Sequence, residues 1–85
     1  MQEVTGPTPQ QVEDYAKALG KRLKDLRDER GLKRNWVAKQ LGVHYDTVKY
    51  WELGRTRPGP KGILFFAKVY GVEPEEFYEG IDIRP

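Results

Sequence analysis

Basic side chains are the groups in this sequence whose spacing most clearly points to a chemistry, namely binding to phosphates. Between Lys17 and Lys68 there are 14 Lys and Arg residues against five acids, a balance of +9 within a chain of net charge +2. The rest of the chain holds eight acids and only one basic residue, Arg84. A basic centre with acidic ends suits a domain that meets a polyanion with its middle. The alternative is that these cations only coat solvated helix faces.

Catalytic and metal-binding groups are missing from the sequence. It contains no nucleophile–base pair and no glycine-rich phosphate loop, so we expect no catalytic residue and no enzyme activity. With no cysteine and His44 as the single histidine, the chain offers no set of metal ligands. We therefore expect no metal, no cofactor and no small-molecule substrate.

The segment Arg34 to Trp51 has the spacing of a helix-turn-helix. Ala38 is small enough for the inner face of a first helix where a second helix crosses it closely. Gly42, four residues later, suits a turn that needs a positive φ, and Val48, six residues further on, fills the wedge from the second helix. The same side of the motif is completed by Leu41, Val43 and Trp51.

From Leu19 to about Tyr78 the chain resembles the DNA-binding domains of the XRE family, which includes Cro and the phage repressors. The matching segments are LGKRLKDLRDERGL before the turn, WELGRTRP after the second helix, and FFAKVYGVEPEEF near the end. Residues in register with the family are Arg27, Gly31, Glu52, Gly54, Pro58, Ala67 and Gly71. The resemblance implies an all-α fold, a compact bundle of five helices, here with an N-terminal extension of helix 1.

Sequence patterns place the five helices. Thr8-Pro9-Gln10-Gln11 is a capping box with proline in the first helical position, and an apolar stripe continues from there to about Arg30. Gly20 interrupts this stripe and could kink or break the helix. The other helices are expected at 33–41, 44–53, 60–71 and 73–78. Residues 1–8 are expected to be disordered, 9–80 to form the domain with its motif at 34–53, and 81–85 to form a short tail.

The resemblance also implies which side chains would contact DNA, since in this family the second helix of the motif enters the major groove. The positions that contact bases correspond to Tyr45, Asp46, Lys49 and Tyr50. Lys49 could donate to guanine and Asp46 could accept from cytosine, although Asp46 equally suits a helix N-terminus. Phosphate contacts are expected from Arg34, Asn35, His44, Thr47, Arg55 and Arg57, while Lys61 suits a solvated position better.

Two further sets of residues are expected to hold the structure together. In the family an arginine and a glutamate form a buried ion pair, which here would join Arg27 to Glu52. Apolar residues beyond the needs of one small core suggest a dimer interface made of Phe65, Val69, Phe77, Tyr78 and Ile81, with Ile83 adding to it. The alternative is that Ile81 and Ile83 fold back on their own domain, against the turns before Leu19 or against Trp36.

Together these features predict a sequence-specific regulator of transcription that binds double-stranded DNA. It is expected to act as a repressor, to insert helix 44–53 into the major groove, and to bind an inverted repeat as a homodimer. The alternative is an antitoxin-like module of the same fold that binds a protein partner through exposed aromatics such as Trp36 and Phe65. The longest uncharged apolar run, GILFFA, is too short to cross a bilayer, and a cytoplasmic protein is expected.

Overall fold

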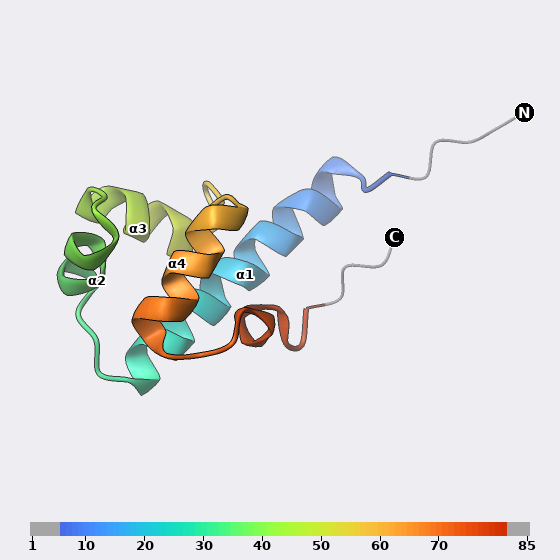
Figure 1. Ribbon diagram of the computed structural model, residues 1–85. Helices are drawn as coiled ribbons and strands as arrows, with labels where there is room; N and C mark the ends of the chain where they lie inside the picture. Colours follow the sequence, from blue (N-terminus) through green and yellow to red (C-terminus); the bar gives the residue numbers. More distant parts are fainter. Residues whose placement is uncertain (1–5, 82–85) are drawn as a thin grey trace, which may run out of the picture.

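The computed structural model describes residues 6–81, and the elements in that range are helical. They are α1 (Pro9–Glu29), α2 (Arg34–Leu41), α3 (Tyr45–Leu53), α4 (Pro60–Tyr70) and a short 3-10 helix, η1 (Pro74–Tyr78) (Figure 1). The expected all-α class is confirmed for these residues, but the fifth helix is not an α-helix. Five residues opened by a proline are too few to build a regular α-helix, and a tighter turn results. Most of the expected disordered N-terminal segment and of the tail, including Ile83, lies outside the described residues.

Helix α1 begins at the expected capping box. The Thr8 hydroxyl accepts from the Gln11 backbone N–H at 3.1 Å, and the Thr8 N–H donates to the Gln11 side chain at 2.8 Å. The helix then runs without a break through Gly20, so neither a kink nor an interruption occurs there. A Cβ atom on Gly20 would lie only 2.4 and 2.6 Å from the carbonyl oxygens of Trp51 and Glu52. Gly20 therefore allows the backbones of α1 and α3 to meet.

The turn between α2 and α3 has the geometry that its spacing predicts. Gly42 adopts φ 70°, a left-handed conformation that glycine tolerates without strain. Ala38 and Val48 are buried, with 3% and 0% of their surfaces exposed, where the two helices cross. The remaining expected lining residues, Leu41, Val43 and Trp51, are only partly buried.

An aromatic cluster closes the core between α1 and α4. Phe66 meets Trp51 and Tyr70 edge-on with ring centroids 5.4 Å apart, and Phe77 at 6.3 Å. Burial raises the pKa of the Tyr70 hydroxyl, which has no hydrogen-bond partner among the described residues. Phe77 is completely buried, so it stabilises its own domain and does not line a dimer interface as the sequence had suggested.

The burial of Val69 and Ile81 corrects the expected interface further. Both side chains are partly buried and pack against the core cluster, so Ile81 folds back on its own domain. Tyr78 is 37% exposed, and its pKa is raised by burial and by the neighbouring Tyr15 hydroxyl. The extra turns of α1 thus contact the C-terminal end of the domain through Tyr15.

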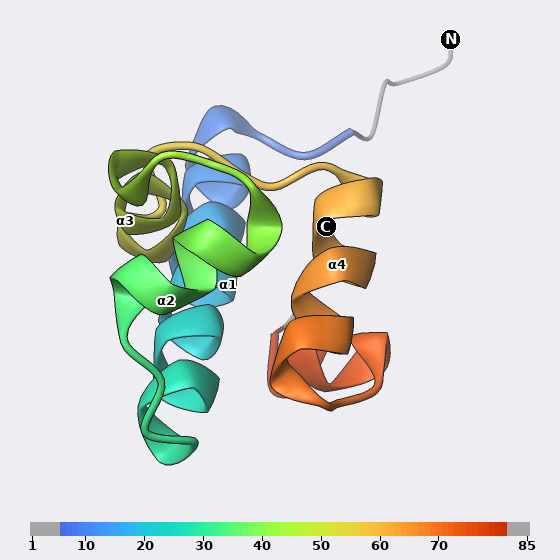
Figure 2. The same cartoon turned by 60° about the vertical axis from the view of Figure 1, so that its left-hand side comes forward.

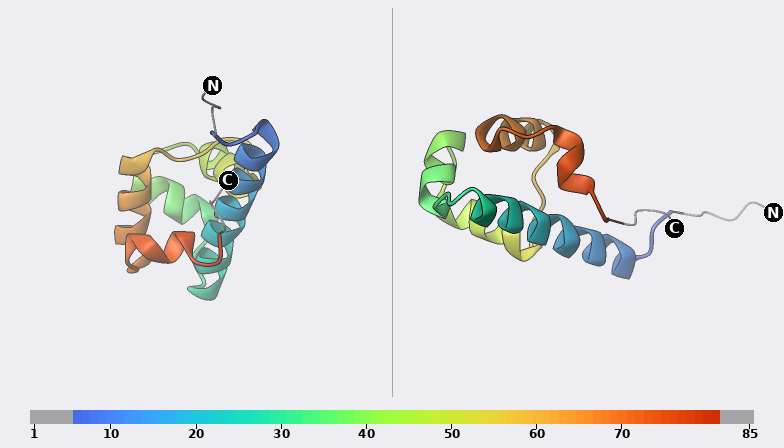
Figure 3. Two further views of the ribbon diagram at one scale, coloured as in Figure 1. Left: turned by 90° about the vertical axis from the view of Figure 1, so that its right-hand side faces the viewer. Right: turned by 90° about the horizontal axis from the view of Figure 1, so that it is seen from below.

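The helices are arranged around α1, which runs the length of the molecule. Helix α3 lies against α1, and α4 stands on the far side of the core (Figure 2). From α4 the chain returns through η1 to the side of α1, whose first turns project beyond the other helices (Figure 3). Arg22 fastens η1 to α1 by donating to the Glu76 carbonyl at 2.7 Å and to the Glu79 carboxylate at 2.9 Å. No helix of residues 6–81 combines the length and hydrophobicity needed to cross a membrane.

Candidate nucleic-acid interface

Helix α3 presents a polar and aromatic face to solvent. Tyr45 and Tyr50 are 40% and 38% exposed, and Asp46 and Lys49 are exposed beside them. Val48 and Glu52 of the same helix are buried. The four side chains expected to contact bases therefore lie on the surface of the helix and not in the core.

His44 caps the N-terminus of α3, which begins one residue later than the sequence suggested. Its Nδ1 accepts from the Asp46 backbone N–H at 3.1 Å, so one unpaired donor of the helix end is satisfied. Because Nδ1 acts as an acceptor, the ring proton of the neutral side chain is on Nε2. His44 remains exposed, and its cap is a structural role that the phosphate assignment did not include.

Many of the cations counted in the sequence are already neutralised or used within the fold. On α1, Lys17, Lys21 and Lys24 each pair with an acid one helical turn away, at 2.7 to 3.2 Å. Arg30 donates to the carbonyl of Tyr70 at 2.8 Å and helps to close the end of α4. These cations of α1 are therefore already engaged within the fold.

Three cations without an ion-pair partner among residues 6–81 lie on α3 or in the loop that follows it. None of the ion pairs among residues 6–81 involves Lys49, Arg55 or Arg57, and all three side chains are exposed. Helix α2, which packs against α3, adds free backbone N–H groups, because no side chain caps its N-terminus at Lys33. Its first N–H groups are therefore available to an anion, and Asn35 is exposed in the same turn.

The ion pair expected between Arg27 and Glu52 forms in the structure. Arg27 Nε lies 2.6 Å from one carboxylate oxygen and Nη2 lies 3.1 Å from the other, with side-chain exposures of 9% for Arg27 and 1% for Glu52. Arg27 also donates to the Leu32 carbonyl at 2.9 Å. The hydrogen bond to Glu52 is the main cause that raises the pKa of Arg27, so the arginine stays charged.

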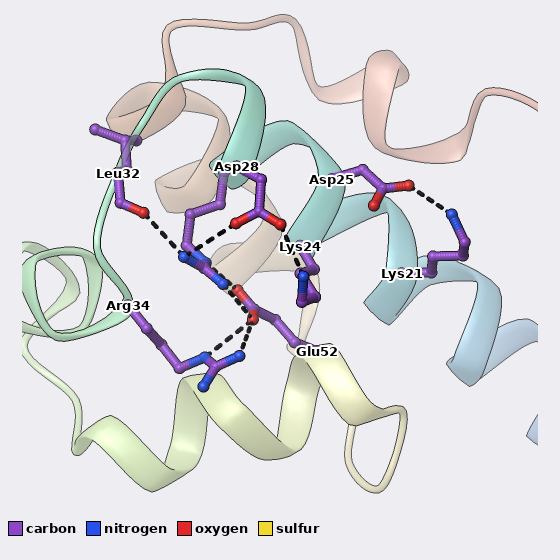
Figure 4. A network of polar contacts seen from close by, with 8 residues as sticks. Lys21, Lys24, Asp25, Asp28, Leu32, Arg34 and Glu52 are labelled. Atoms are coloured by element: carbon purple, nitrogen blue, oxygen red, sulfur yellow. Dashed lines mark hydrogen bonds and ion pairs between the residues drawn. The ribbon is translucent and has the colours of Figure 1, made fainter.

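Arg34 joins this pair, which the sequence did not predict. Its Nε and Nη2 lie 3.0 and 2.9 Å from the same Glu52 oxygen, and its Nη1 donates to the Tyr45 hydroxyl at 2.9 Å. Burial opposes the charged form, but the hydrogen bonds to Tyr45 and Glu52 outweigh it and raise the pKa of Arg34. The guanidinium that was expected at a phosphate is thus bound inside a network that connects α1, α2 and α3 (Figure 4).

Each exposed tyrosine of α3 is accompanied by an arginine. The Arg34 guanidinium carbon lies 5.5 Å from the centre of the Tyr45 ring, and that of Arg55 lies 5.6 Å from the centre of the Tyr50 ring. Such cation–π contacts favour the charge and order the ring. Thr47, also expected at a phosphate, is only partly exposed. No group of three or more metal-binding side chains occurs in the described part of the chain.

Comparisons with known proteins agree with this geometry. Residues 18–79 match the model of a helix-turn-helix domain family. The HTH-type transcriptional regulator DdrOP3 of Deinococcus deserti is 31% identical over 64 residues, which are 75% of this chain and 50% of that protein. The chain thus spans half the length of this relative. The crystal structure of the restriction-modification controller protein C.AhdI from Aeromonas hydrophila is similar with a TM-score of 0.69 and 31% identity, covering 75% of this chain and 96% of that one.

Proposed function

The chain belongs to the helix-turn-helix domain family, of the XRE type that its motifs resemble, and we propose that it is a sequence-specific regulator of transcription that binds double-stranded DNA. The observation that carries this proposal is the exposed face of α3, which combines hydrogen-bonding side chains with the unpaired cations around it. A helix with these properties fits the major groove of B-DNA. The names of both similar proteins, a transcriptional regulator and a controller protein, support the same function.

The proposed docking divides the contacts into two kinds. Tyr45, Asp46, Lys49 and Tyr50 contact base edges, because they occupy the outward side of α3. Phosphates are met by the uncapped start of α2 with Asn35, by the partly exposed Thr47 in the first turn of α3, and by the exposed residues at the two ends of α3, namely His44, Arg55 and Arg57. Repression would follow where the bound site overlaps a promoter, and a reporter gene behind the selected site tests for it.

Substitutions of Lys49 and Arg57 should affect DNA binding differently. Lys49→Ala removes one proposed base contact, so it should weaken the preferred site by about 1 kcal/mol, roughly fivefold, and relax the sequence requirement. Arg57→Ala should weaken all sequences alike and make the slope of log K against log salt shallower by about one unit. Binding titrations over a range of salt concentrations measure both effects.

Lys21→Ala serves as a control for these titrations, since Lys21 is exposed on α1 and already paired with Asp25. We expect it to leave affinity and specificity unchanged. If Lys49→Ala and Arg57→Ala also behave like the parent, α3 does not lie in the groove.

A homodimer would give the single short recognition helix a site of useful length. Two copies would place their α3 helices in successive major grooves, about 34 Å apart, on an inverted repeat. The burial of Phe77 moves the proposed interface to α4, where Leu64 and Phe65 are 57% and 52% exposed. Tyr78 is the remaining exposed member of the expected set.

Phe65→Glu should separate the proposed dimer without unfolding the domain, because the side chain contributes little to the core. A charge at the centre of an apolar contact is left desolvated when two copies associate. Sedimentation at micromolar concentration should show the parent as a dimer and the variant as a monomer. Leu53→Glu, at a residue that is 48% exposed on α3, is the control and should sediment like the parent. A parent that is monomeric both free and on DNA, protecting one half-site, would exclude the dimer.

A protein-binding module remains the second candidate because Trp36 is 44% exposed on α2. The unpaired cations around α3 distinguish the two functions. If they bind DNA, affinity for random duplexes should appear at low salt and fall steeply as salt is added. No binding to random duplexes at low salt would favour a protein partner.

A further inference from the structure

Arg34 connects two positions of the recognition helix. Tyr45 stands in the first turn of α3 and Glu52 near its end, and Arg34 of α2 reaches both with separate nitrogens. All three guanidinium nitrogens are therefore engaged. The Glu52 side chain is 1% exposed and is also held by Arg27 from α1. The carboxylate that holds Arg34 is thus itself buried and fixed in place by Arg27.

We propose that Arg34 is a positioning residue that determines specificity by making the Tyr45 hydroxyl a hydrogen-bond donor toward DNA. The inference rests on the proposed function. Arginine only donates hydrogen bonds, so the 2.9 Å contact uses the Tyr45 oxygen as an acceptor. The hydroxyl hydrogen must then serve another partner. Because Tyr45 is 40% exposed, that partner can come from outside the protein.

The direction of this hydrogen bond restricts which bases Tyr45 can contact. In the major groove guanine presents N7 and O6 as acceptors, adenine presents N7, and thymine presents O4. Cytosine presents only its N4 amino group, which is a donor. A tyrosine oxygen that already accepts from Arg34 is a weak acceptor for a second donor, and its own hydrogen would be directed at the amino group. We therefore expect cytosine to be disfavoured at the position that Tyr45 contacts.

The geometry of Arg34 also lowers the entropic cost of this contact. A hydroxyl held by a hydrogen bond and a ring covered by a guanidinium at 5.5 Å lose less freedom when DNA binds. Arg55 provides the comparison within the same molecule. It lies 5.6 Å from the Tyr50 ring, but no hydrogen bond among the described residues joins it to the Tyr50 hydroxyl. Arg55 should therefore not fix the hydrogen-bond direction of Tyr50.

The test is selection of bound sites from a random duplex library with the parent, Arg34→Lys, Tyr45→Phe and the double variant. Lysine keeps the charge but lacks the fork that reaches Tyr45 and Glu52 together. The parent should disfavour cytosine at one position by about 2- to 10-fold, the effect of a single hydrogen bond. Both single variants should remove this bias, and the double variant should remove no more than Tyr45→Phe. Arg55→Lys is the matched control and should retain it.

A measurement without DNA separates positioning from binding. Aromatic carbon relaxation should show an ordered Tyr45 ring in the free parent and a more mobile ring in Arg34→Lys, while Arg55→Lys leaves Tyr45 ordered. If Arg34→Lys does not fold, Tyr45→Phe, which removes one exposed oxygen, still tests the cytosine bias.

The outcomes distinguish this inference from the proposed function. A retained cytosine bias or an equally ordered ring in Arg34→Lys would overturn the role of Arg34 and leave DNA binding intact. Uniform weakening of all sequences by Arg34→Lys would also overturn it, since Arg34 would then act as a phosphate contact. A parent that selects no sequence would remove the proposed function and this inference together.

Discussion

Glu52→Gln should lower the free energy of unfolding by about 3 to 5 kcal/mol, because it strands two arginines around an amide that carries no charge. Arg27 and Arg34 both donate to the Glu52 carboxylate, whose side chain is 1% exposed. Desolvation of Arg27 is compensated mainly by this carboxylate, with smaller contributions from the Leu32 carbonyl and from Asp28, whose carboxylate lies 3.5 Å from Arg27 Nη1. A loss of this size approaches the whole stability of a small domain, about 5 to 15 kcal/mol. Chemical denaturation of parent and variant measures it.

The contacts in this network predict the order in which substitutions of its three members lower the free energy of unfolding. Arg27→Met should cost less than Glu52→Gln, because Arg34 still pairs with the buried carboxylate. Arg34→Met should cost about 1 kcal/mol or less, since the two-fold contact between Arg27 and Glu52 survives and Arg34 is partly exposed. Replacing all three charges with apolar side chains should recover much of the loss. Equal stability of the parent and Glu52→Gln would show that the carboxylate is solvated.

Local rules explain the parts of this structure that the sequence predicted. The capping box at Thr8 and the left-handed turn at Gly42 depend only on residues a few positions away. Ala38 and Val48 are buried for the same kind of reason, since the short turn between α2 and α3 determines where the helices cross. The pair of Arg27 and Glu52 came from the family resemblance, because no local pattern relates residues so far apart in the chain.

Interactions between helices explain what the sequence could not predict. Arg34 lies 11 residues from Tyr45 and 18 from Glu52, and only the packing of α2 on α3 brings the three together. Apolar patterning could not decide which aromatic of η1 enters the core, and the structure buries Phe77 and leaves Tyr78 exposed. The expected dimer interface was therefore wrong at Phe77.

The sequence also could not predict which positive charges are paired within the fold. The sequence counts Lys17 and Lys24 as part of its basic centre, but side-chain geometry pairs both with acids of α1. Lys49 remains unpaired among the described residues, so its charge, unlike theirs, is free to meet a phosphate backbone. A count of charges along the chain cannot separate paired from unpaired cations, because pairing depends on which residues share a helix face.

Gly20→Ala should destabilise the domain by about 2 to 3 kcal/mol, although helix propensity alone predicts a gain of up to about 1 kcal/mol. The new methyl group would lie 2.4 and 2.6 Å from the backbone oxygens of Trp51 and Glu52, which cannot rotate away as a flexible side chain can. Helix α3 must therefore shift away from α1. Because α3 carries the proposed base contacts, affinity for the preferred DNA site should fall while binding to random duplexes persists in the folded fraction.

Gly62→Ala is a control that tests whether the effect of Gly20→Ala comes from the close contact between the backbones of α1 and α3. In Gly62→Ala on α4, the added methyl would meet only a Pro58 side-chain carbon at 3.1 Å, which a shift of a few tenths of an ångström relieves. This control should change stability by less than about 1 kcal/mol and leave DNA specificity intact. Thermal denaturation and site selection on both variants provide the measurements. A Gly20→Ala protein that is more stable than the parent and equally specific would show that the two backbones do not meet at Gly20. Helix propensity would then govern this position, as the sequence alone suggests.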